Sequence, residues 1–160
     1  GGGIAGCATA YALANRGVNV TLLERHAAVA QEASGNPIGV LYPRLAAHAN
    51  HADAMAMISY LYTLRLLNQL ALDHSQFGPC GLLQLAFNSR ETARIESIAK
   101  RKLDVEIVRY VNKQEASDLA GVPILHDGLY FPDAGWVKPQ AFCQALVQHP
   151  NITVLNHIQV

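Results

Sequence analysis

The chain has 160 residues, of which 51% are hydrophobic and 15% are charged, and this composition is typical of a folded globular domain rather than a disordered segment. The formal net charge of zero gives no overall electrostatic attraction for nucleic acid, although a local basic patch is compatible with it. The cysteines Cys7, Cys80 and Cys143 show no CxxC spacing, so we expect reduced thiols in a cytoplasmic protein.

The first six residues follow the pattern G-x-G-x-x-G, which allows a backbone to approach a pyrophosphate. Gly1 would form the tight turn, Gly3 would leave room for the phosphates, and Gly6 would let the following helix pack on a sheet. We also expect Ile4 and Ala5 at this site, beside the helix N-terminus, where amide groups and the helix dipole favour an anion. Taken alone, the pattern also fits a flexible glycine-rich start.

The residues after the glycine turn favour dinucleotide binding. Residues 5–16 are rich in alanine and leucine, as a helix should be, and Gly17 stands where helices often end. Residues 18–23 predict a buried strand that ends at Glu24, at about the 20-residue interval where this fold places an acid for the ribose hydroxyls. The alternative for Glu24 is a solvated strand end. Arg25 follows it directly, and we expect it at the same site.

A connection without clear periodicity follows, up to about residue 45. Long irregular connections beside a nucleotide site are more often functional than accidental. Ser34 and Asn36 offer small polar groups, and Gly35 permits close approach of the backbone. An ordinary turn cluster would give the same pattern, so both interpretations stay open here.

The rest of the chain predicts alternating helices and strands. We expect helices over residues 53–75, 88–102, 113–121 and 138–149, and strands over residues 82–87, 105–111, 129–131 and 152–160. Asn88 with Glu91, and Asn112 with Glu115, resemble capping boxes. The apolar run from Ala54 to Leu72 is interrupted by polar residues and predicts a buried helix, not a membrane span.

This order predicts an α/β fold with three segments. Residues 1–45 would be the first part of a nucleotide-binding domain, residues 46–135 an inserted α+β cap or substrate region, and residues 136–160 a return to the first domain. No hydrophobic strand precedes Gly1, and the chain stops when the returning strand is reached. We therefore expect a piece of a longer protein, truncated at both ends.

Two other groups of residues could carry chemistry. His48, His51 and Asp53 could share a helix face, but they lack a further ligand at metal spacing, so we expect no metal. The predicted helix 88–102 is basic, and a solvated face is favoured over contacts to phosphates. Its cationic residues are Arg90, Arg94, Lys100, Arg101 and Lys102. No motif for nucleophilic hydrolysis is present in the sequence.

Several segments carry a resemblance to a known family. The glycine turn and Glu24 resemble the opening of the D-amino-acid-oxidase-like flavoprotein superfamily. Within it the chain is similar to the oxidoreductase domains of bifunctional enzymes that make 5-methylaminomethyl-2-thiouridine in bacterial tRNA. The segments that carry this closer likeness are Ala33–Pro43, Cys80–Leu85, Leu119–Pro123, Gly128–Pro132 and Gly135–Pro139.

The resemblance implies a Rossmann-like FAD-binding domain with an inserted cap. Gly1, Gly3 and Gly6 map onto the pyrophosphate turn and Glu24 onto the ribose acid. Residues 34–36 map onto the segment beside the flavin and its phosphates. Val160 maps onto a strand position whose backbone touches adenine. Ile38 departs from the family, in which a glutamine is expected, and the family's later segments have no counterpart in this chain.

The resemblance also implies an activity. Family members oxidatively remove the carboxymethyl group from carboxymethylaminomethyl-2-thiouridine at the tRNA wobble position, and a fused methyltransferase domain then methylates the product with S-adenosylmethionine. The partner would be tRNA. The alternatives are an FAD amine oxidase of glycine or sarcosine type, or an inactive nucleotide-binding fragment. No catalytic residue is predicted: Tyr42, Arg44 and His48 could touch substrate, but packing or surface roles fit them as well.

Overall fold

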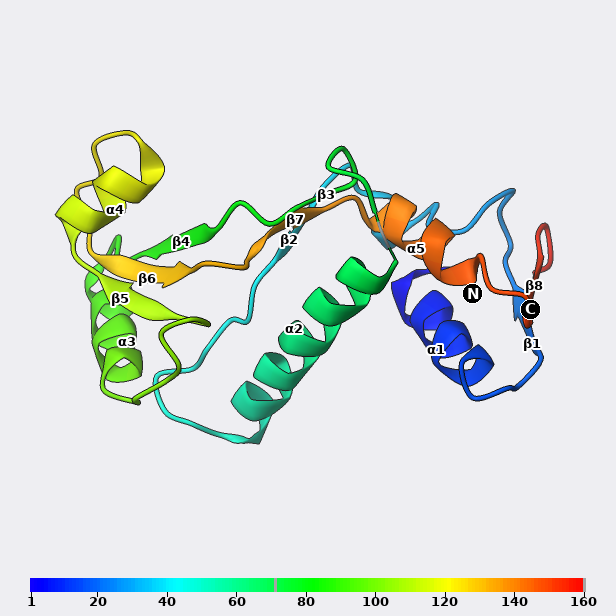
Figure 1. Ribbon diagram of the computed structural model, residues 1–160, viewed down its shortest axis with the longest axis horizontal. Helices are drawn as coiled ribbons and strands as arrows, with labels where there is room; N and C mark the ends of the chain where they lie inside the picture. The colour runs from blue at the N-terminus through cyan, green and yellow to red at the C-terminus, as the bar shows by residue number, and fades with distance from the viewer. Residues whose placement is uncertain (71, 160) are drawn as a thin grey trace. The chain divides into compact units, whose positions relative to one another are not determined.

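The computed structural model describes residues 1–70 and 72–159, and it shows an α/β fold (Figure 1). Its helical elements are α1 (Ile4–Ala14), the 3-10 turn η1 (Ala33–Gly35), α2 (His51–Gln69), α3 (Ser89–Ala99), α4 (Lys113–Ala120) and α5 (Pro139–Val147). Its strands are β1 (Val20–Leu23), β2 (Gly39–Leu41), β3 (Phe77–Gly78), β4 (Leu82–Leu85), β5 (Arg109–Val111), β6 (Gly128–Phe131), β7 (Gly135–Val137) and β8 (Ile152–Leu155). The strands form three small sheets, with the orders β1-β8, β2-β7-β3 and β4-β6-β5.

The chain divides into two compact units. Unit 1 contains Gly1–Gly39, Leu66–Gly78 and the residues from Trp136 onward, whereas unit 2 contains Val40–Arg65 and Pro79–Gly135. The sequence pattern did not indicate that the end of α2 and β3 belong with unit 1. Which unit serves the cofactor and which the substrate stays a prediction.

Unit 1 is built on the parallel pair of β1 and β8, in which Val20 lies opposite Ile152 and Leu23 opposite Leu155. Helix α1 packs against β1 and α5. It can approach closely because the side chains that it buries are small, namely Cys7, Ala10 and Ala14. Gly17, with φ of +83°, reverses the chain after the helix, as expected from the sequence.

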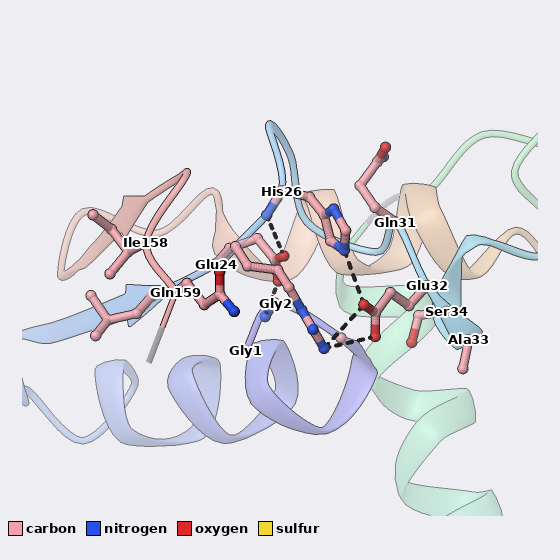
Figure 2. A pocket seen from close by; sticks show the side chains of 13 residues that line it. Gly1, Gly2, Glu24, His26, Gln31, Glu32, Ala33, Ser34, Ile158 and Gln159 are labelled. Atoms are coloured by element: carbon pink, nitrogen blue, oxygen red, sulfur yellow. Dashed lines mark hydrogen bonds and ion pairs between the residues drawn. The ribbon is translucent and has the colours of Figure 1, made fainter.

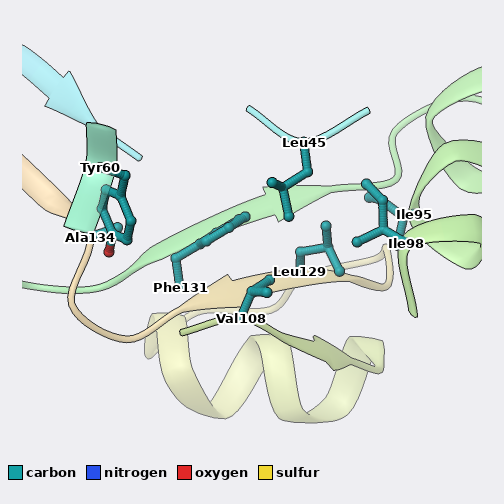
Figure 3. Close-up of a cluster of buried hydrophobic side chains, with 8 residues drawn as sticks. All are labelled: Leu45, Tyr60, Ile95, Ile98, Val108, Leu129, Phe131 and Ala134. Atoms are coloured by element: carbon teal, nitrogen blue, oxygen red, sulfur yellow. The ribbon is translucent and has the colours of Figure 1, made fainter. Parts of the chain in front are cut away.

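Unit 2 contains the antiparallel sheet β4-β6-β5, with α3 and α4 packed against it (Figure 1). In this sheet Leu129 lies opposite both Gln84 and Tyr110. The hydrophobic core between the sheet and α3 is shown in Figure 3, and it joins residues from five separate stretches of the sequence. Its buried members are Leu45, Tyr60, Ile95, Ile98, Val108, Leu129, Phe131 and Ala134.

One predicted strand is largely wrong. Of residues 105–111 only Arg109–Val111 are extended. The preceding residues turn because the Asp104 carboxylate accepts a hydrogen bond from the Glu106 amide at 3.0 Å, and the Asp104 carbonyl accepts from the Ile107 amide. Such side-chain bonds to the local backbone compete with sheet pairing.

The helix ends differ in detail from the predictions. Helix α2 ends at Gln69 instead of continuing to residue 75, and the Asp73 carboxylate instead accepts from the Ser75 amide in a turn. Asn112 and Glu115 form the predicted capping box of α4. At α3 the Asn88 side chain caps as predicted, but the Glu91 carboxylate turns to Arg94, so the reciprocal half of that box is not made.

Three short strands were not predicted: β2, β3 and β7. Each has two or three residues, and β3 is defined only through antiparallel pairing of Phe77 with Val137 and Gly78 with Trp136, far along the chain. Strand β8 stops at Leu155, earlier than the predicted end. Over residues 1–70 and 72–159, no helix has the length and apolar character needed to cross a membrane.

Candidate cofactor site

A cavity of about 380 Å³ lies within unit 1, where the N-terminus of α1, the end of β1 and the segment leading into η1 meet (Figure 2). This volume lies at the lower end of the range of ligand pockets. The lining residues are Gly1, Gly2, Gly3, Leu23, Glu24, Arg25, His26, Gln31, Glu32, Ala33, Ser34, Ile158 and Gln159.

Close approach requires two glycines of the turn, Gly2 and Gly6, whereas a Cβ on Gly1 would meet nothing within 4 Å. A Cβ on Gly6 would overlap the carbonyl oxygen of Gly1, and it would also lie 3.5 Å from Leu22 of β1. A Cβ on Gly2 would lie 2.9 Å from both a carboxylate oxygen of Glu24 and a methyl group of Val29. The turn therefore keeps its backbone bare on the cavity side and lets α1 pack on the sheet.

The N-terminus of α1 suits an anion. The Ile4 amide donates to the Ser34 hydroxyl at 3.0 Å, whereas helix geometry leaves the Ala5 and Gly6 amides without a carbonyl of the same helix to bond. Among the described residues the first turn carries no acidic side chain, and Gly3 at the cap position has no side chain to donate or accept. Amide hydrogens and the helix dipole together attract negative charge at this end.

Glu24 is buried, with 6% of its surface exposed, and both of its oxygens are held. One oxygen accepts from the His26 amide at 2.8 Å and the other accepts from the Gly2 amide at 2.6 Å. These two amides lower the pKa of Glu24 below its ordinary value, so the group stays ionised. A carboxylate has about four acceptor positions, so capacity remains for two hydroxyl groups of a ligand.

An ion cluster joins the end of β1 to the segment before η1 (Figure 2). Glu32 contacts a guanidinium nitrogen of Arg25 at 3.0 Å and the imidazole Nε2 of His26 at 3.0 Å. The hydrogen bond from His26, followed by the charge of Arg25, lowers the pKa of Glu32. The cluster is more than half exposed at Glu32, so it contributes charge to the cavity lining rather than much stability.

The structure brings five of the eleven predicted site residues to the lining of this cavity. Gly1, Gly3, Glu24, Arg25 and Ser34 line it directly. Ile4, Ala5 and Gly6 lie in the first turn of α1 and do not line the cavity, although the Ile4 amide donates to the Ser34 hydroxyl, which does.

The remaining predicted site residues lie elsewhere. Gly35 does not line the cavity: a Cβ there would lie 2.9 Å from the Ala30 carbonyl oxygen, so the glycine serves the packing of the loop. Asn36 is exposed and also lies outside the lining. Val160 lies outside the described residues. The sequence reasoning missed His26 and Glu32, whose only signal was their charge beside an irregular segment.

The other constellations have structural roles. The Asp53 carboxylate pairs with Arg101 and accepts from the Ala46 amide at 2.7 Å, so it is already engaged within unit 2. Across the described parts of the chain, no three His, Cys, Asp or Glu side chains gather as a metal site would require. Tyr42 packs edge-on against Phe131, with ring centroids 6.0 Å apart, which favours its packing role.

Comparison with solved structures supports the architecture. Glycine oxidase from Geobacillus kaustophilus superposes with a TM-score of 0.77 over 100% of this chain and 46% of that chain, at 21% sequence identity. L-alpha-glycerophosphate oxidase from Mycoplasma pneumoniae, a structure with FAD bound, gives a TM-score of 0.66 over 100% of this chain and 44% of that chain, at 24% identity. At these identities the likeness establishes the fold alone, which is the α/β fold that these two structures share.

The family follows from the sequence comparison. Residues 1–155 match the family described as FAD dependent oxidoreductase (DAO), and the chain belongs to this family. The resemblance inferred from the glycine turn and the later segments is thereby confirmed.

Similar curated proteins carry a more specific description. The "tRNA 5-methylaminomethyl-2-thiouridine biosynthesis bifunctional protein MnmC" of Methylobacillus flagellatus is 48% identical over 153 residues, which is 96% of this chain. The protein of the same name from Pseudomonas fluorescens (strain Pf0-1) is 46% identical over 157 residues, or 98% of this chain. The chain spans about 24% of the length of each of these relatives.

Proposed function

We propose that this chain forms part of the FAD and substrate sites of an oxidoreductase that modifies the wobble uridine of tRNA. The reaction would remove the carboxymethyl group from carboxymethylaminomethyl-2-thiouridine and leave the aminomethyl form. A fused methyltransferase domain would then methylate this amine with S-adenosylmethionine, in the cytoplasm. The observation that carries the proposal is the identity of 44–48% between this chain and bifunctional tRNA-modification proteins over nearly its whole length.

The cavity in unit 1 fits the adenosine and pyrophosphate end of FAD. The bare backbone of Gly1 and Gly3 and the amides at the start of α1 would hold the pyrophosphate. The two free acceptor positions of Glu24 would take the ribose hydroxyls, and Arg25 would lie beside them. These features support the assignment because each matches a different part of a dinucleotide.

The remaining predicted cofactor contacts belong to the same proposal. Ser34 would exchange its bond with the Ile4 amide for one to a phosphate, while Gly35 and Asn36 would approach the flavin and Val160 would contact adenine. When bound, FAD would accept a hydride from the carbon next to the substrate nitrogen. The protein groups would hold the cofactor and orient the substrate.

The division of labour between segments is also proposed. Residues 1–45 and 136–160 would belong to the cofactor domain, and residues 46–135 would face the substrate. Unit 2, which contains most of the second segment, has its own sheet and core, as expected for a cap region.

Anaerobic bleaching of the flavin tests the proposal. The complete protein that carries this chain, purified with its flavin, is mixed with tRNA bearing the carboxymethylaminomethyl group. The controls are the same tRNA without that group, free glycine and free sarcosine. We expect loss of oxidised-flavin absorbance with the modified tRNA alone. Bleaching by glycine or sarcosine with tRNA inert would instead assign a small-amine oxidase, and a purified protein without flavin would leave the inactive nucleotide-binding interpretation.

A further inference from the structure

Two of the positively charged side chains of the segment 90–102 form hydrogen bonds and ion pairs within unit 2. The Arg94 side chain is 13% exposed, and its guanidinium donates to the Leu45 carbonyl at 2.7 Å and to the Glu91 carboxylate at 2.7 Å. Arg101 donates to the Ala46 carbonyl at 2.9 Å and pairs with the buried Asp53. The predicted basic face is therefore not one continuous patch, and its outward charge must come from other residues.

The bond from Arg94 to the Leu45 carbonyl places Arg44 beside the first turn of α3. Arg44 and Arg90 are both exposed, and both lie close enough to Glu91 to lower its pKa, after the larger effect of Arg94. Since Arg94 already pairs with Glu91, the charges of Arg44 and Arg90 are left in excess. They lie at the positive end of the α3 dipole, which adds to the attraction for anions.

An exposed aromatic side chain lies at the same end of α3 as these arginines. Phe87 directly precedes the helix cap Asn88, a position from which an apolar residue usually packs on the fourth helical residue. Here that residue is Thr92, whose hydroxyl donates back to the Asn88 carbonyl at 3.0 Å, and Phe87 remains 66% exposed. The Phe87 ring therefore does not make this packing contact and remains exposed to solvent, three residues before Arg90.

We propose that Phe87, Arg90 and Arg44 form an RNA-contacting surface, which we name the α3 entrance surface. Arg44 and Arg90 would contact phosphates, and Phe87 would stack on an unpaired base. Positive side chains beside an exposed aromatic ring are the combination by which proteins bind single-stranded nucleic acid, whereas an acidic peptide would give the ring no planar partner. The inference rests on the proposed function, because tRNA is the RNA that would be bound.

Binding of a labelled bacterial tRNA with uridine at the wobble position tests this surface. The complete, FAD-loaded protein is titrated by fluorescence anisotropy at 50, 100 and 200 mM KCl, and flavin absorbance per protein is recorded for each variant. For R44Q/R90Q we expect the Kd at 100 mM KCl to rise roughly 10-fold and the salt slope to fall by about 1.4 to 2. For F87A we expect the Kd to rise roughly 5-fold or more with an unchanged salt slope, and F87W should bind as the wild type does.

The matched control is K100Q/K102Q, which removes the same charge from residues at the opposite end of the helix. We expect its Kd to stay within about twofold of the wild type, and flavin content to be unchanged in every variant, because the α3 entrance surface and the cofactor cavity lie in separate units. If flavin content falls in R44Q/R90Q, the conservative pair R44K/R90K, which keeps both charges, must retain binding for the proposal to stand.

The outcomes separate this surface from the proposed function. Unchanged Kd and salt slope in R44Q/R90Q, with flavin still bleached by modified tRNA, would overturn the surface and leave the activity in place. Absence of binding of this tRNA by the wild type would overturn the surface, whereas the proposed function is overturned separately if the modified tRNA fails to bleach the flavin. Poly-glutamate that binds more tightly than tRNA, and loses this binding in R44Q/R90Q, would assign the surface to an acidic protein and overturn the assignment to RNA.

Discussion

The Glu24 carboxylate accepts the amide hydrogen of Gly2 at 2.6 Å, across 22 residues of sequence. The acid at the end of β1 and the glycine turn at the start of α1 are therefore one hydrogen-bonded assembly. The second oxygen of the same carboxylate binds the His26 amide, so the group also fixes the chain as it leaves β1. A substitution at Gly2, Glu24 or His26 should therefore alter the backbone position of the other two residues.

Replacing Glu24 by glutamine should weaken FAD binding. The substitution turns one carboxylate oxygen into an NH2 group, which would face the amide hydrogen of Gly2 or His26. That buried amide then has no acceptor, and leaving it unsatisfied costs about 1–3 kcal/mol. We expect the Kd for FAD, measured by titrating the deflavinated complete protein, to rise roughly 5- to 150-fold. E106Q, which alters an exposed carboxylate of unit 2 outside the cavity lining, serves as the control and should change the Kd by less than about twofold. A wild-type Kd in E24Q would refute this role.

Retention of the flavin should depend on pH through Glu24. Its pKa is lowered in the folded state, so the unfolded chain binds a proton at the ordinary value of 4.5 while the folded chain does not. The stabilisation is complete above that value and is lost as the pH falls through the lower folded pKa. Asp53 acts in the same direction: burial raises its pKa, but the Arg101 hydrogen bond, the Ala46 amide and the Arg101 charge together lower it.

The measurement for this prediction is the apparent Tm and the flavin released between pH 3 and pH 7. Both should be nearly constant from pH 6 to 7, and stability should fall below about pH 4.5. In E24Q the same curve should be flatter in that range because one titrating group is gone. A fall of equal steepness in E24Q and the wild type would show that Glu24 does not contribute.

Gly6→Ala should disrupt the cofactor site, whereas Gly17→Ala should not. A Cβ at Gly6 meets the Gly1 carbonyl oxygen, which is backbone and cannot rotate away, so the turn must move. Gly17 has open space around it and loses only its left-handed conformation, at about 1 kcal/mol. Flavin absorbance per purified protein should fall severalfold in G6A and stay close to wild type in G17A. Equal flavin content in the two variants would contradict the steric argument.

Arg101→Met should release the segment that precedes α2. The substitution leaves the Asp53 carboxylate buried without its ionic partner, a change that typically costs about 3–5 kcal/mol. Hydrogen exchange read by mass spectrometry should show lost protection at residues 44–53, including the Ala46 amide that donates to Asp53. The double variant D53N/R101M removes the stranded charge, so its loss of Tm should be smaller than the sum of the single losses. Strict additivity would argue against the pair.

The sequence was informative where structure is local. The capping box of Asn112 and Glu115 depends on residues three apart, and the glycine turn with Glu24 depends on a spacing that one helix and one strand determine. These features could be predicted because few other parts of the chain compete with them. The strand predicted from Val105 was wrong because a local contact competed with it. The Asp104 carboxylate accepts a hydrogen bond from the nearby backbone, which the apolar pattern did not reveal.

The features that were missed depend on contacts between distant residues. Strand β3 exists because Phe77 meets Val137, and no property of two residues predicts such a partner. Glu32 meets Arg25 and His26 because the loop returns to the glycine turn, where the Ala30 amide donates to the Gly2 carbonyl at 2.9 Å. Likewise, the sequence of residues 90–102 did not reveal that two of its arginines donate hydrogen bonds to the backbone carbonyls of residues 45 and 46.

The parallel pairing of β1 with β8 has a consequence for biosynthesis. Val20 pairs with Ile152, which is synthesised much later. At a ribosomal rate of 5–20 residues per second, β1 therefore remains without this partner for roughly 7–26 s after it is synthesised. Residues 79–135 of unit 2 are complete before β8 is made. During translation the edge of β1 that β8 later covers is open to wrong strands, and a chaperone that shields it would act in that interval.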